Sequence, residues 1–165
     1  MADSVWSLRE EDLKVIEAEL VKLNALANAK ITFLVDKDGH LVATAGDARN
    51  LDTESLASLT AGNIAATGGI AKILGEKEFT FLFHEGENDN IHLSVIAQRI
   101  ILVVIFDQRS SLGLVRLRVR KSGEVLAQIF NVILNHKEKE GLGEANVSRS
   151  PFSAITEADI DKLFG

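Results

Sequence analysis

The segment that most constrains the fold is LTAGNIAATGGIAKILGE, at residues 59–76. It is dense in glycine and alanine, yet its other residues repeat like those of a helix. Glycine inside a helix costs about 1 kcal/mol relative to alanine. Gly62, Gly68 and Gly69 together would therefore cost about 2–3 kcal/mol. The segment is either a glycine-rich loop for phosphate or a helix that lacks bulk on one side for a reason.

The phosphate-loop hypothesis fails on spacing. A loop of this kind needs the pattern G-x-x-x-x-G-K-[ST], in which backbone N–H groups surround the phosphate and the lysine reaches it. The fifth residue after Gly62 is Thr67, and Gly69 is followed by Ile70. The dinucleotide pattern G-x-G-x-x-G is absent as well. We therefore interpret the segment as a helix.

In this helix we expect the bulkier apolar residues to cover a sheet, namely Leu56, Leu59, Ala66, Ile70, Ile73 and Leu74. The small residues then fall on the opposite side, at Ala57, Ala61, Ala65, Gly68 and Gly69. Surface helices usually carry lysine and glutamate there, which are better helix formers. A helix side without bulky side chains allows another backbone to approach closely, which favours a contact with a second segment or molecule. The alternative is a tightly packed interior helix, because small residues often simply fill cores.

The rest of the chain predicts an α/β (α+β) fold. We expect a helix at 7–27, two strands in a hairpin at 30–46, the glycine-rich helix, three strands between 78 and 107, and a helix at 112–133. Gly39 supplies the positive φ of the hairpin turn. This order, α-β-β-α-β-β-β-α, gives a five-stranded, mostly antiparallel sheet with helices on both faces.

Apolar residues vanish after residue 136, so we expect one domain at 1–138 and a flexible linker with a short terminal segment at 139–165. The terminal segment follows Pro151 and is amphipathic and helical in pattern. Its apolar residues are Phe152, Ile155, Ile160, Leu163 and Phe164. A helix this short needs a surface to pack on, either in the domain or in a partner.

Charge and composition exclude several classes of protein. The net charge of −6 does not favour nucleic acid or anionic lipid. Cysteine is absent, which rules out disulfides and thiolate metal sites. The first residues are acidic and lack the apolar core of a signal peptide. The longest apolar run, at 100–106, is far shorter than the about 20 residues of a membrane helix. We expect a soluble, cytoplasmic protein.

Three other patterns contain residues that could take part in metal binding or catalysis. The stretch HEGENDNIH gathers possible metal ligands, but a strand–turn–strand explains its polarity. Asp36 to Gly39 resembles the start of a calcium loop, yet position twelve is Asp47 and a hairpin turn fits better. A basic patch at Arg109, Arg116, Arg118, Arg120 and Lys121 fits a solvated helix face. No triad or nucleophile elbow is present. We expect no catalytic site, no metal and no cofactor.

Residues 51–120 strongly resemble the roadblock family, and within it a bacterial branch that acts in gliding and cell polarity. The matching stretches are LDTESLASLTAGNIAATGGIAKILGEKEF, FHEG and ILVVIFDQRSSLGLVRLRVRK. The resemblance extends over about residues 8–130, and SPFSAITEADIDKLF resembles the tail of that branch. It implies a five-stranded sheet with the second helix on one face and the first and third on the other. It also implies a homodimer whose sheets join edge to edge and whose second helices lie side by side.

The resemblance further implies a GTPase-activating protein for a small Ras-like GTPase of the MglA type. One dimer would hold one GTP-bound GTPase over its paired helices, at a cell pole. The regulator would arrange the GTPase's own catalytic residues and supply no arginine finger, while the GTPase holds the nucleotide and Mg²⁺. A scaffold that docks partners without speeding hydrolysis is the alternative. By this resemblance, the residues of the helix that contact the GTPase and the second copy are Ala57, Thr60, Ala61, Ile64, Ala65, Gly68, Gly69 and Lys72. The terminal segment is a second candidate contact.

Overall fold

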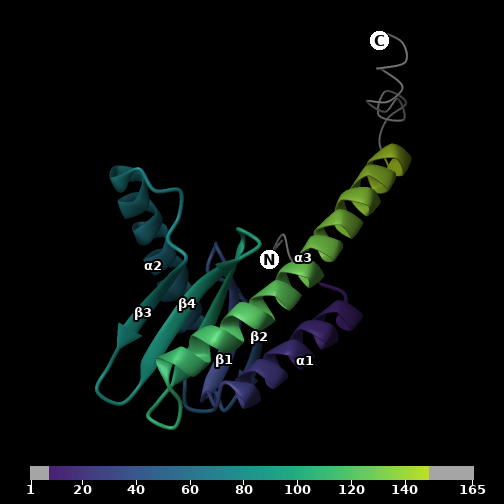
Figure 1. The fold of residues 1–165 in the computed structure, drawn as a ribbon. Coiled ribbons are helices and arrows are strands. Elements are labelled where there is room, and N and C mark those ends of the chain that lie inside the picture. Colours follow the sequence, from purple (N-terminus) through teal and green to yellow (C-terminus); the bar gives the residue numbers. More distant parts are fainter. Residues whose placement is uncertain (1–7, 149–165) are drawn as a thin grey trace. The chain divides into compact units, whose positions relative to one another are not determined.

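The structure is a computed structural model that describes residues 8–148. It confirms the predicted fold class and the predicted order of elements (Figure 1). These are α1 (Glu10–Leu26), β1 (Ile31–Asp36), β2 (Leu41–Gly46), α2 (Thr53–Leu74), β3 (Phe81–Glu85), β4 (Asn90–Ile96), β5 (Ile100–Phe106) and α3 (Leu112–Ser148). The terminal residues Phe152, Ile155, Ile160, Leu163 and Phe164 lie outside the described residues.

The five strands form one antiparallel sheet in the order β2-β1-β5-β4-β3. Strands β1 and β5 are neighbours inside the sheet and pair along residues 31–36 and 100–105, with Phe33 opposite Val103. Every residue of these two strands is buried, which explains why their sequences are continuous apolar runs without alternation. Strand β3 lies at one edge of the sheet and β2 at the other.

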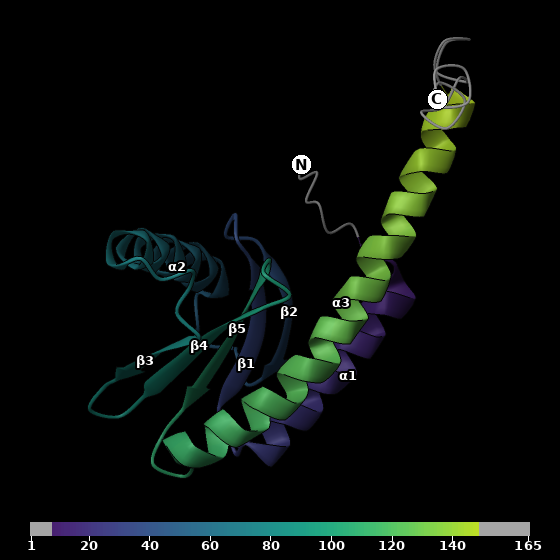
Figure 2. The same cartoon turned by 45° about the horizontal axis from the view of Figure 1, so that its top comes forward.

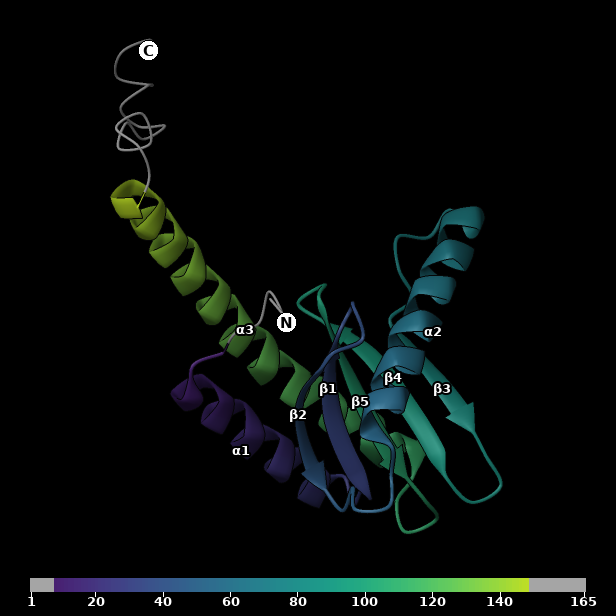
Figure 3. The same cartoon turned by 180° about the vertical axis from the view of Figure 1, so that it is seen from behind.

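The described residues divide into two compact units with the boundary between Gln128 and Ile129, and α3 crosses this boundary. In the first unit, α2 covers one face of the sheet, while α1 and the first part of α3 lie on the opposite face (Figures 2 and 3). Helix α1 packs on β1 and β2 through a buried stripe of Ile16, Leu20 and Leu23. The expected distribution of helices between the two faces is thus confirmed.

Helix α3 is longer than the sequence predicts. It ends at Ser148, so the prediction of a flexible linker is wrong for residues 139–148. The prediction relied on apolar periodicity, which stops at Ile133. The following residues include two lysines and three glutamates, which favour a helix without any apolar stripe. The domain boundary at residue 138 stays a prediction.

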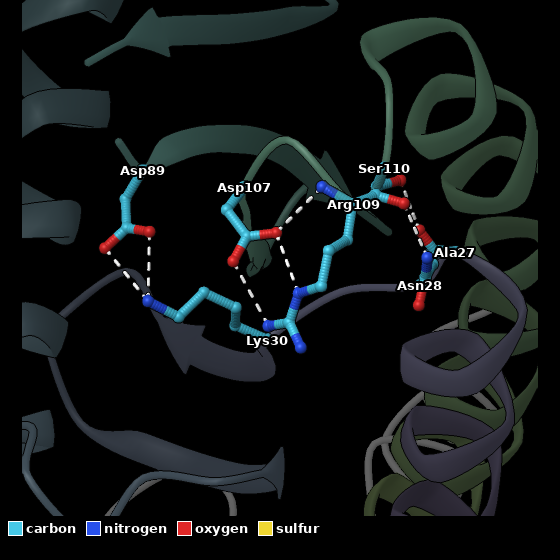
Figure 4. A network of polar contacts seen from close by, with 7 residues as sticks. All are labelled: Ala27, Asn28, Lys30, Asp89, Asp107, Arg109 and Ser110. Carbon is cyan, nitrogen blue, oxygen red and sulfur yellow. Dashed lines mark hydrogen bonds and ion pairs between the residues drawn. The ribbon is translucent and has the colours of Figure 1, made fainter. Parts of the chain in front are cut away.

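Polar contacts join the end of α1 to the loop before α3 (Figure 4). Asn28, which has a φ of 53°, donates from its side-chain amide to the backbone oxygen of Arg109. Ser110 Oγ donates to the backbone oxygen of Ala27. Arg109 Nε and Nη2 each donate to an oxygen of Asp107 at 3.1 Å. These hydrogen bonds lower the pKa of Asp107 and raise that of Arg109.

Gly46, at the end of β2, gives the first prediction. Its φ is +96°, and an added Cβ would lie 2.4 Å from the backbone oxygen of Lys30. Gly46→Ala should therefore lower the free energy of unfolding by about 2–4 kcal/mol, measured by urea denaturation. The matched control is Gly113→Ala, where nothing lies within 4 Å of the added Cβ. Equal stability of the two variants would contradict the prediction.

Candidate functional site

Helix α2 is fixed at both ends by its own sequence. Asp52 is the N-cap, and one of its side-chain oxygens accepts from the Ser55 backbone N–H at 3.1 Å. The other oxygen accepts from Ser55 Oγ at 2.6 Å, and the two hydrogen bonds lower the pKa of Asp52. Gly75 ends the helix with a φ of +77° and donates to the carbonyls of Ala71 and Lys72. The predicted helix is therefore present, with its start at the predicted LDTES stretch.

The small residues in the first half of α2 face the sheet, which corrects the predicted orientation. Ala57 is completely buried and Ala61 is 7% exposed, and both belong to the core that includes Phe33 and Val103. Thr60 is buried as well. The alternative of a tightly packed interior helix is therefore right for this half of α2.

The close approach of the β1–β2 hairpin explains why these positions are small. A Cβ on Gly39 at the hairpin turn would lie 3.2 Å from Ser58 Cα and 3.7 Å from Ala61 Cβ. Side chains larger than alanine at Ala57 and Ala61 would push the helix away from the turn and from the sheet. Another backbone does approach the small residues, as expected from the sequence, but it belongs to the same chain.

The bulkier apolar residues of α2 point away from the sheet. Leu59 is 72% exposed and Ile73 is 85% exposed, and Ile70 and Leu74 are exposed as well. The prediction that they cover the sheet is wrong for these four residues and for Ala66, which is also exposed, whereas Leu56 packs against the core as predicted. Three of these four residues, Leu59, Ile70 and Ile73, form with the intervening small residues a continuous exposed stripe without any charge, here called the outer stripe. It consists of Leu59, Gly62, Ala66, Gly69, Ile70 and Ile73.

A groove of 530 Å³ lies between the second half of α2 and the strands β3 and β4, where the helix stands off the sheet (Figure 2). On the sheet side it is lined by Leu82, Leu93 and Val95. On the helix side it is lined by six of the eight predicted contact residues, namely Ala61, Ile64, Ala65, Gly68, Gly69 and Lys72. The other two, Ala57 and Thr60, lie in the core. The groove and the outer stripe together form a candidate docking surface.

In the described part of the chain, no contact explains why α2 has glycine at three positions. An added Cβ at Gly62, Gly68 or Gly69 would meet nothing within 4 Å. Each glycine still costs about 1 kcal/mol of helix stability relative to alanine. Their presence is explained if a second molecule approaches the helix closely at this surface.

Gly69→Ala should raise the free energy of unfolding by about 1 kcal/mol, because alanine favours the helix and the added methyl group has open space. The measurement is urea denaturation at low protein concentration, where self-association is weakest. Ala66→Gly on the same stripe is the reverse control and should lower stability by a similar amount. A loss of stability in Gly69→Ala under these conditions would refute the prediction.

The polar residues of HEGENDNIH are not brought together as a metal site in the described part of the chain. His84 Nε2 lies 2.9 Å from Asn63 Nδ2 of α2, and Asp89 pairs with Lys30 at 3.0 Å. Among residues 8–148, the group that could hold a metal ion is Asp36, Asp38 and His40.

The Asp36 carboxylate of this group is engaged within the hairpin turn. Asp36 is buried and its Oδ1 accepts from the backbone N–H groups of Asp38 and His40, both at 2.9 Å. Its Oδ2 lies 3.3 Å from His40 Nδ1. These contacts fit the hairpin interpretation of the sequence.

Two of the basic residues near the start of α3 interact with neighbouring side chains. Arg109 is held by both oxygens of Asp107, and Arg116 lies over the Phe81 ring with its Cζ 4.5 Å from the ring centroid. Arg120 and Lys121 are exposed. Most of the patch is thus a solvated helix face, as expected.

The comparisons with known proteins identify the family. The model of the Roadblock/LC7 domain matches residues 15–106, and the chain belongs to this family. Among solved structures, the chain is similar to MglB of Myxococcus xanthus, with 52% identity and a TM-score of 0.73. That match covers 76% of this chain and 94% of the other. A comparison with curated proteins gives no match.

Two further structures support the same branch of the family. The gliding protein MglB of Thermus thermophilus is 30% identical over 74% of this chain and 93% of its own, with a TM-score of 0.70. An MglB in a tetrameric arrangement is 29% identical over 74% of this chain and 92% of its own, with a TM-score of 0.69. Within residues 8–148, no helix is long and apolar enough to cross a membrane.

Proposed function

We propose that this chain is a homodimeric GTPase-activating protein for a small Ras-like GTPase of the MglA type. The observation that carries the proposal is the docking surface of α2, an exposed apolar stripe beside a groove, on a chain that is 52% identical to an MglB. Apolar patches exposed in this way mark interaction surfaces. In this role the chain has no catalytic site and no cofactor, and the GTPase holds the nucleotide and Mg²⁺.

Activation works through positioning. Phosphoryl transfer depends mainly on the placement of the attacking water and on charge stabilisation, both of which the GTPase's own residues can supply once they are held in place. The engagement of Arg109 by Asp107 and of Arg116 by Phe81 fits a mechanism without an arginine finger. The regulator stabilises the hydrolytic arrangement of the GTPase by contact through α2.

The homodimer uses the side of the molecule that carries the docking surface. Strand β3 is at the sheet edge, and the outer stripe of α2 lies on the face above the sheet. Two copies can join their β3 edges and place their α2 helices side by side, so that a pair of chains holds one GTPase. The terminal segment at 152–164 adds a second contact to the GTPase. The complex acts at a cell pole in the cytoplasm and controls polarity and gliding.

Single-turnover GTP hydrolysis by the cognate GTPase, with and without this protein, tests the function. Correct placement of the catalytic groups should accelerate hydrolysis by about 10²-fold. Light scattering of the mixture should give two copies of this chain for each GTP-bound GTPase. Binding without any change in the hydrolysis rate would instead identify a docking scaffold, and the proposed activity would be wrong.

A further inference from the structure

A second cavity, of 350 Å³, lies on the sheet face opposite α2. It is formed by β3, β4 and the first part of α3, and its polar lining includes His92, Ser94, Arg116 and Arg120. Ser94 also lines the groove beside α2, whereas His92, Arg116 and Arg120 do not. The positively charged part of the cavity, on α3, is therefore distinct from the proposed docking surface.

Two polar atoms in the lining residues are buried without a partner. His92 is only 3% exposed, and its Nδ1 has no hydrogen bond. The Oγ of Ser94 is also buried without a hydrogen bond. Leaving a buried polar group unpaired costs about 1–3 kcal/mol, so a ligand that pairs with these atoms would recover that energy.

The imidazole of His92 is neutral near neutral pH. Burial, together with the charge of Arg116, lowers its pKa to about 4. A neutral imidazole offers one N–H donor and one acceptor nitrogen. His92 and the hydroxyl of Ser94 can therefore donate to, or accept from, a polar group that enters the cavity.

The cavity combines positive charge with apolar walls. Arg116 lies over Phe81, whose ring stacks on His92 with centroids 5.0 Å apart. Arg120 follows one helical turn after Arg116, and Glu124 is the one carboxylate in the lining. The remaining wall is largely apolar and includes Ile96, Val119 and Ala127. In an acidic protein this lining combines two positive charges with an apolar wall.

We propose that this cavity binds a small organic carboxylate with an apolar or aromatic body. The two arginines face the carboxylate, since charge-assisted hydrogen bonds from guanidinium groups are among the strongest in proteins. The apolar body packs against Val119 and Ala127, and Ser94 and His92 complete the hydrogen bonding. Because both arginines belong to α3, on the sheet face opposite α2, the charged end of the ligand lies away from the outer stripe.

Titration of the ¹⁵N-labelled full-length protein with benzoate, followed by NMR, tests the proposal. We expect saturable shifts of the His92 and Ser94 backbone signals at millimolar concentrations, with sodium chloride keeping the ionic strength constant. Benzamide keeps the ring but lacks the charge, so it should bind about tenfold more weakly. Equal binding of benzamide, or the absence of saturable shifts at both residues, would overturn the proposal.

Arg120→Gln and Lys121→Gln form a matched pair, because each removes one positive charge from an exposed position of α3 and only Arg120 lines the cavity. Arg120→Gln should weaken benzoate binding about tenfold, and Lys121→Gln should leave it within a factor of about two. An equal loss in both variants would mean general charge attraction and would refute a defined site. Ser94→Ala should weaken binding about fivefold.

Discussion

Replacing Ile70 and Ile73 together by aspartate is expected to abolish the acceleration of GTP hydrolysis while the protein stays folded. Both side chains are more than half exposed on the outer stripe, so the core loses little on substitution. At an interface, however, two aspartates would bury charge against an apolar surface. We expect the binding free energy to become less favourable by at least about 2 kcal/mol, which corresponds to about thirtyfold weaker association.

The control is Val15→Asp with Val21→Asp on α1, on the opposite face of the sheet. These two side chains are 53% and 59% exposed, so the control adds the same charge to a similar apolar setting. It should leave the hydrolysis rate and the oligomeric state unchanged. Full acceleration by the Ile70→Asp, Ile73→Asp protein would show that the outer stripe does not dock the GTPase or the second copy. If the acceleration is lost, light scattering shows whether the variant has lost its dimer or only its binding to the GTPase.

The order of elements could be predicted because each element has a strong local signal. Gly39 in a polar turn between two β-rich runs predicts a hairpin, and its φ of +94° confirms why glycine is there. The apolar runs of β1 and β5 predict strands buried on both faces. These signals depend on neighbours in the sequence and need no knowledge of the tertiary structure.

The rotation of α2 could not be predicted in the same way. Small residues such as Ala57 and Ala61 line one side and bulkier ones such as Leu59 and Ile73 the other, and neither side carries much charge. Periodicity separates two such sides but does not say which one is buried. The deciding contact is the approach of the Gly39 turn to Ser58, which joins residues far apart in the sequence. One signal was available, because a helix with two uncharged sides favours an interpretation in which both sides are covered.

The carboxylate cavity could not be predicted for a related reason. The sequence places His92 beside other histidine and acidic residues, which suggests only a metal ligand. Its partners in the cavity come instead from β3 and from α3, at Phe81 and Arg116. Pairing across strands and packing of a distant helix bring these residues together. A sequence window around His92 cannot contain that information.

The orientation of α2 leads to the largest expected effect on stability. Ala61→Arg should lower the free energy of unfolding by about 3–5 kcal/mol, because Ala61 is only 7% exposed and the long side chain must displace core neighbours beside Phe33 to reach the groove. Such a loss is a large fraction of the total stability of a domain, which is about 5–15 kcal/mol. Urea denaturation followed by circular dichroism measures it.

Ala65→Arg, one helical turn later, is the matched control, since Ala65 is exposed at the rim of the groove. It should change the free energy of unfolding by less than about 0.5 kcal/mol, yet it should obstruct docking because the long side chain projects over the groove. The sequence places both alanines on one bare side, so it predicts the same behaviour for both. If both variants prove equally stable, Ala61 faces outward as the sequence predicts, and the buried packing of α2 on the hairpin is wrong.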